Sequence, residues 1–86
     1  MHIVIRGSFH TRADVLALIG RAAWGIDRPG PTNLDGLADL IKETGLRSIT
    51  IQGIWAVDEK TASAINRICG DLGVSLRLPA GTDPVP

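Results

Sequence analysis

Two kinds of apolar spacing alternate along this chain of 86 residues, and their order limits the folds that it can adopt. In some stretches apolar residues occupy every second position, which is typical of a strand with one better-buried face, and in others they recur at helical spacing. The expected strands comprise residues 2–6, 47–52 and 74–78, and the expected helices comprise residues 12–23, 33–44 and 58–72. The sequence therefore predicts the element order β-α-α-β-α-β.

Two general rules predict how these elements are arranged. Strands that are joined through helices run parallel, because the helix carries the chain back along the sheet. Helices on both faces of a sheet require strands that are apolar throughout, whereas all three strands here alternate. We therefore expect a two-layer α/β sandwich, with a three-stranded parallel sheet and the helices mainly on one face. The domain should span residues 1–78, and residues 79–86 should form a flexible tail.

Residues that break or cap secondary structure mark the ends of several elements. Gly7–Ser8 should end the first strand. Thr11 lies three residues before Asp14, close to the capping-box pattern that begins a helix. Prolines and glycines crowd the stretch before the second helix, which predicts a loop there. Thr32 or Asn33 can then cap the second helix.

Each expected helix carries an apolar stripe that should face the core. The stripes comprise Val15, Leu18, Ile19 and Ala22 in the first helix, Leu34, Leu37, Ala38 and Ile41 in the second, and Thr61, Ile65, Ile68 and Leu72 in the third. Cys69 lies beside the third stripe, which favours a small core residue over a nucleophile. Trp55 follows the second strand, where a structural role is expected.

Charge and cysteine content argue against several classes of protein. Nine Lys and Arg residues balance nine Asp and Glu residues, and the cations are scattered, so direct nucleic-acid binding is not expected. The single cysteine allows no disulfide within the chain, which fits a reducing compartment such as the cytoplasm. No apolar run approaches the roughly 20 residues that span a bilayer, so no membrane association is expected.

The sequence contains no recognisable catalytic constellation. His2 and His10 lack partners at metal-ligand spacing, so no metal site is expected. No Gly-rich phosphate-binding loop is present, and Pro31 removes one backbone donor near the start of the second helix, which weakens an anion site there. We therefore expect a binding protein without a cofactor, not an enzyme.

Three carboxylates form a row along the second helix. Asp35, Asp39 and Glu43 recur at four-residue steps, where like charges repel, and Lys42 is the cation within this helix. Gly36 lies beside the row, although glycine in a helix costs about 1 kcal/mol relative to alanine. A solvated face remains one interpretation. Carboxylates beside a bare backbone also suit a protein partner that presents Arg or Lys.

The residues around this row resemble a known family. Thr32–Asp39, which reads TNLDGLAD, is similar to the Asn-Leu-Asp-Ala-Leu-x-Asp signature of barstar-like proteins, the intracellular inhibitors of barnase-type ribonucleases. The framework also resembles that family, because Ile5–Gly7 ends a strand before a helix and Trp55 follows a later strand. The resemblance covers about residues 2–78.

The resemblance implies how such a protein would act. The second helix and the loop before it would enter the cationic substrate cleft of a ribonuclease or related toxin, and their carboxylates would exclude RNA by competition. Asn33 would cap the helix, and the protein would be a cytoplasmic monomer when free. The expected partner-binding residues are Trp24, Asp27, Thr32, Asn33, Asp35, Gly36, Asp39 and Glu43.

Several positions depart from the family pattern and leave alternatives open. Ala38 replaces a bulky aromatic residue, Ile68 stands where a late glutamate is usual, and the chain has no tyrosine. These departures indicate a divergent nuclease or another toxin domain as partner. Trp24 could anchor an interface or pack against the loop. A general interaction or regulatory domain without a nuclease partner is the alternative function.

Overall fold

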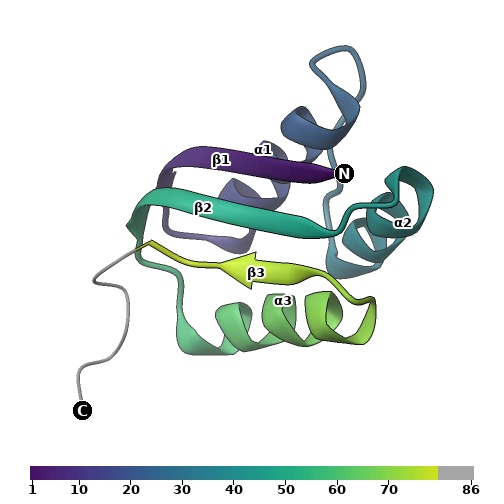
Figure 1. The fold of residues 1–86 in the computed structure, drawn as a ribbon. Helices are drawn as coiled ribbons and strands as arrows, with labels where there is room; N and C mark the ends of the chain where they lie inside the picture. Colours follow the sequence, from purple (N-terminus) through teal and green to yellow (C-terminus); the bar gives the residue numbers. More distant parts are fainter. Residues whose placement is uncertain (80–86) are drawn as a thin grey trace.

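A computed structural model describes residues 1–79, and it confirms the predicted element order (Figure 1). The elements are β1 (His2–Phe9), α1 (Arg12–Trp24), α2 (Leu34–Thr44), β2 (Ser48–Trp55), α3 (Glu59–Asp71) and β3 (Ser75–Arg77). The tail expected for residues 79–86 lies, from residue 80 onward, outside the described residues. No helix within residues 1–79 is long and apolar enough to cross a membrane.

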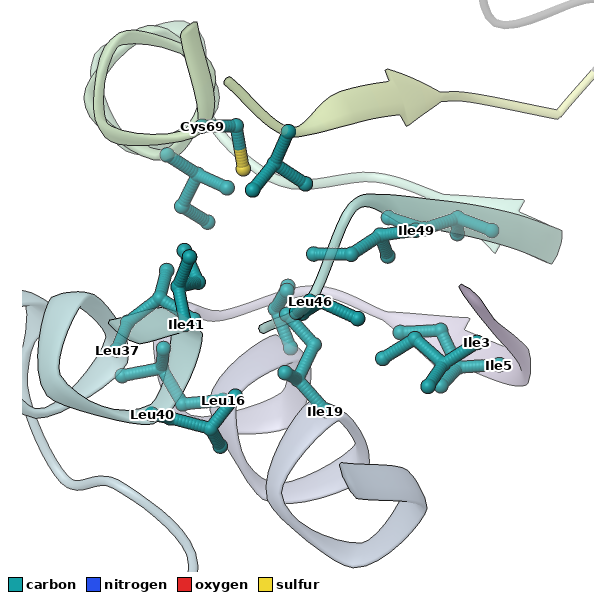
Figure 2. Close-up of a cluster of buried hydrophobic side chains, with 14 of the residues drawn as sticks. Ile3, Ile5, Leu16, Ile19, Leu37, Leu40, Ile41, Leu46, Ile49 and Cys69 are labelled. Atoms are coloured by element: carbon teal, nitrogen blue, oxygen red, sulfur yellow. The ribbon is translucent and has the colours of Figure 1, made fainter. Parts of the chain in front are cut away.

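The three strands form one parallel sheet in the order β1-β2-β3, as predicted. Their alternation places Ile3 and Ile5 of β1 beside Ile49 and Ile51 of β2 on the buried face. Side chains from the helices meet these isoleucines from one side of the sheet (Figure 2). Among residues 1–79 the opposite face stays open, and exposed Val4 lies on it. The fold is therefore the expected two-layer α/β sandwich.

The prediction that Gly7–Ser8 ends the first strand was wrong. β1 and β2 remain paired as far as Phe9 and Trp55. Gly7 lies directly opposite Gly53, and this pair of glycines lets the two backbones pass without side chains between them. The rings of Phe9 and Trp55, whose centroids are 5.9 Å apart, then close the end of the sheet. The contact supports the structural role expected for Trp55.

Polar side chains cap the N-termini of the helices. The predicted capping box of α1 is present, because the Asp14 amide donates to Thr11 Oγ1 at 3.2 Å and the Thr11 amide donates to Asp14 Oδ2 at 3.1 Å. The backbone donors of His10 and Thr11 also lower the pKa of Asp14. Asn33, not Thr32, caps α2, since its Oδ1 accepts from the Gly36 amide at 2.7 Å.

The apolar stripes differ in detail from the predicted ones. In α1, Ala22 is exposed and Leu16 is buried instead, because the loop after the helix lies over the Leu16–Gly20 side. In α2, Leu40 joins the fully buried residues, whereas Leu34 is only half-buried. In α3, the predicted stripe residue Ile65 and its neighbour Cys69 are the two fully buried residues, whereas Ile68 and Leu72 are only half-buried.

Cys69 is a core residue, as the sequence predicts. Its side chain lies in the apolar cluster between α3 and the sheet (Figure 2). Burial there disfavours the thiolate and raises the pKa of the thiol to about 11. Because the thiolate is the reactive form, this environment keeps the cysteine unreactive at neutral pH.

Candidate functional site

The carboxylates of Asp35 and Asp39 lie exposed on the outer side of α2. Leu37, Leu40 and Ile41 turn the other side of this helix into the core, so the amphipathic pattern fixes which residues face solvent. Within residues 1–79, neither carboxylate makes a side-chain hydrogen bond or an ion pair. Both charges are therefore available to a cation supplied from outside the described part of the chain.

Glu43, the third carboxylate of the row, is already paired. Arg28 reaches it from the loop before α2, and its two terminal nitrogens bond the two carboxylate oxygens, Nη2 to Oε2 at 3.0 Å. This fork-shaped pairing holds the planar guanidinium in one orientation. It lowers the pKa of Glu43 and raises the pKa of Arg28. The relief of charge repulsion in the row thus comes from the loop.

Trp24 provides a platform for the same arginine. The Arg28 guanidinium carbon lies 3.8 Å from the centroid of the indole ring, which is a cation–π arrangement. The indole is partly buried against the core, and its Nε1 is buried without a hydrogen-bond partner among the described residues. Of the two roles considered for Trp24, the structure thus shows packing against the loop. Arg28 thereby joins the end of α1 to the end of α2.

We predict that Arg28→Ala will raise the pKa of Glu43 toward its ordinary value of 4.5. Because Arg28 lowers the pKa in the folded protein, the stabilisation from this pair is complete above the ordinary pKa of Glu43. It is lost as the pH falls through the lowered value. Titration of the side-chain carboxyl signals by NMR would measure the shift.

Asp58 is the internal control for this titration. Its pKa is also lowered, but by Thr61, first through the Thr61 side chain and then through the Thr61 amide, which donates to Asp58 Oδ2 at 3.2 Å at the start of α3. Its titration should be the same in the wild-type protein and in Arg28→Ala. An unchanged pKa for Glu43 in the variant would show that the ion pair does not persist in solution.

The loop between α1 and α2 is packed tightly against both helices. A Cβ atom on Gly20 would lie 2.5 Å from the Gly30 Cα, so only glycine allows this approach. Pro31 is buried, and a Cβ atom on Gly36 would lie 3.0 Å from the Pro31 Cβ. The close approach that Gly36 permits is therefore made by the chain's own loop.

The structure brings the predicted site residues together along one side of α2. Arg28 binds Glu43 in the last turn and Asn33 caps the first turn, so residues 28–33 run back along the helix. Thr32 and Asp27 are both exposed on this loop. Sequence analysis missed the roles of Arg28 and Gly20, because nothing in their local spacing marks a contact with Glu43 or with the loop.

The arrangement offers charge recognition but few groups for other chemistry. Within residues 1–79, no group of three or more His, Cys, Asp and Glu side chains is placed to hold a metal ion. A hollow of about 240 Å³ lies between α3 and β3, away from the carboxylates of α2, and is lined by residues that include Trp55, Asn66 and Leu76. The carboxylates of the row are exposed on the outer side of α2, and such a projecting surface suits a concave partner.

No family model, curated protein or solved structure matches this chain.

Proposed function

We propose that this protein is an inhibitor, of the immunity or antitoxin type, that binds a ribonuclease or related toxin domain. In this proposal α2 enters the nuclease's substrate cleft, which is lined with cations because it must bind phosphate. Asp35 and Asp39 occupy the positions of RNA phosphates and exclude the substrate by competition. The inhibitor is a cytoplasmic monomer when free, and it needs no cofactor.

One observation carries this proposal. Asp35 and Asp39 remain unpaired and exposed within residues 1–79, although Arg28 neutralises Glu43 on the same helix. Adjacent like charges on a helix destabilise it slightly, and among residues 1–79 no cation forms an ion pair with either aspartate. A cationic partner would supply the missing countercharge and would also accelerate encounter through long-range attraction.

The barstar-like resemblance supports the same partner class. Its signature includes Asn33, Asp35 and Asp39, and in the structure Asn33 caps the helix that presents the two aspartates. The cap orients the first turn, while burial of Leu37 fixes the rotation of the helix. Both carboxylates are thus held on a rigid element before any partner binds, which reduces the entropy lost on association.

We predict that Asp39→Ala will weaken inhibition of the nuclease at least tenfold, as expected for removal of a charge-assisted contact. The assay is RNA cleavage by a barnase-type ribonuclease, and in parallel by the product of the neighbouring reading frame, titrated with inhibitor at low and high salt. The association rate should fall more in the variant at low salt, because screening already reduces the attraction at high salt.

Asp71→Ala is the matched control for this measurement. Asp71 is also an exposed aspartate in a helix, but it ends α3. Its removal changes the net charge of the protein by the same amount as Asp39→Ala does. Inhibition should stay within about twofold of the wild-type value, since Asp71 lies outside the proposed partner-binding surface. Equal inhibition by Asp39→Ala and the wild-type protein would reject α2 as the inhibitory element.

A further inference from the structure

Ile26 is the most exposed large apolar side chain among the described residues, at 79%. It lies in the loop between α1 and α2, next to Asp27. The other strongly exposed aliphatic side chains, Val4 and Ile54, lie on the open face of the sheet, away from the helices. Ile26 is two residues from Arg28, which binds Glu43, so it lies near the Glu43 end of the acidic row.

The loop holds Ile26 between two fixed points. On one side, the Gly25 amide donates to the Arg21 carbonyl at 3.0 Å and so continues the hydrogen bonding of α1. On the other side, Arg28 lies between the Trp24 ring and the Glu43 carboxylate. The isoleucine is thus presented on an ordered segment, and its burial by a partner would cost little additional loop entropy.

The outer side of α2 itself offers no comparable apolar group. Its exposed residues, Asp35, Asp39, Lys42 and Glu43, are all charged, and the apolar residues of this helix are buried or half-buried. Charges at the exposed rim of an interface mainly set encounter rate and register, whereas long-lived complexes depend on a few fully desolvated anchors, which can be charged, aromatic or apolar. Ile26, the most exposed large apolar residue among residues 1–79, can supply an apolar anchor beside this row.

We infer that Ile26 is an apolar anchor of the partner-binding surface, and that the partner carries an apolar pocket at the border of its cationic cleft. The inference rests on the proposed function and deepens it. Arg28 places the loop at the Glu43 end of the acidic row. The partner's apolar pocket should therefore border the part of its cleft that faces this end of the row. A hollow of about 240 Å³ lies beside the loop on this protein and is lined in part by Ile26 and Arg21. It gives room for the rim of the partner's apolar pocket.

The test compares Ile26→Ser with Ile54→Ser. Ile54 is 58% exposed on the open sheet face, so the control removes the same side chain from another surface. The probe is a barnase-type ribonuclease, and association and dissociation rates are measured at two salt concentrations. Ile26→Ser should weaken binding about 10–100-fold, as expected for loss of one buried aliphatic side chain. The loss should lie mainly in the dissociation rate and should depend little on salt.

The outcomes separate this inference from the proposed function. Binding by Ile26→Ser equal to that of Ile54→Ser, together with weak binding by Asp39→Ala, overturns the apolar anchor and leaves the inhibitor proposal intact. Full binding by Ile26→Leu alongside weak binding by Ile26→Ser supports an apolar contact. A wild-type protein that binds neither the ribonuclease nor the product of the neighbouring reading frame overturns both proposals.

Discussion

Replacing Gly53 by alanine is expected to destabilise the protein by roughly 3–5 kcal/mol, through backbone strain and overpacking together. Gly53 has a φ of +109°, which residues with a side chain rarely adopt, and an added Cβ atom would lie 2.2 Å from the carbonyl oxygen of Gly7. That oxygen belongs to the paired backbone of β1, so it cannot move without disrupting the register. Domains of this size have a total stability of about 5–15 kcal/mol, so much of it would be lost.

Equilibrium unfolding in urea would measure this effect. Gly53 is exposed to solvent, so its low burial alone would predict that an alanine is tolerated there. A large loss of stability would instead show that the close approach of the two backbones decides the outcome. Gly70→Ala is the control, because Gly70 lies in α3 and an added Cβ atom there meets nothing within 4 Å. That change should stabilise the protein by about 0.5–1 kcal/mol through helix propensity. A Gly53→Ala protein as stable as the wild type would contradict the close pairing of the two glycines.

Gly20→Val should cost about 3 kcal/mol and should also displace the loop before α2. An added Cβ atom would lie 2.5 Å from the Gly30 Cα and 2.8 Å from the Pro31 Cδ. Neither atom belongs to a flexible side chain, so the loop itself must move away from α1. Since Arg28 and Asn33 lie on either side of this contact, the proposed inhibition should also be weaker in the variant.

Two measurements would test this prediction. Unfolding in urea gives the stability, and amide hydrogen exchange of residues 26–32 reports whether the loop has opened. Gly70→Val is the matched control, because the same side chain enters an open position on α3. Unchanged exchange in the loop of Gly20→Val, with wild-type stability, would show that α1 and the loop are not packed as described.

Local patterns in the sequence were sufficient to predict the order of elements and the layers. Alternation at Ile3 and Ile5 identified the buried face of β1, and four-residue spacing identified Asp35 and Asp39 as a row on one side of α2. These predictions succeed because strand and helix periods place residues on faces by geometry alone. The position of a cap such as Asn33 is similarly local.

Features that depend on pairing between distant segments were not predictable in this way. Gly7 normally indicates the end of a strand, and only its partner Gly53 explains why β1 continues. Arg28 is 15 residues from Glu43, and nothing in the chain between them marks the ion pair. Ala22 was misplaced because the buried side of α1 is set by the loop as well as by the sheet.

Every residue of the proposed partner surface comes from the single connection between β1 and β2. The stretch from Gly20 to Glu43 contains the loop, its contacts with both helices and the acidic row, whereas β1, the first part of α1, β2, α3 and β3 form the rest of the scaffold. A change of partner can thus arise within one uninterrupted segment of about 24 residues without altering the register of the sheet. If the proposed function is correct, partner specificity can be exchanged by replacing this segment alone, provided that Gly20, Pro31 and Gly36 are kept, because they allow the close packing of the loop.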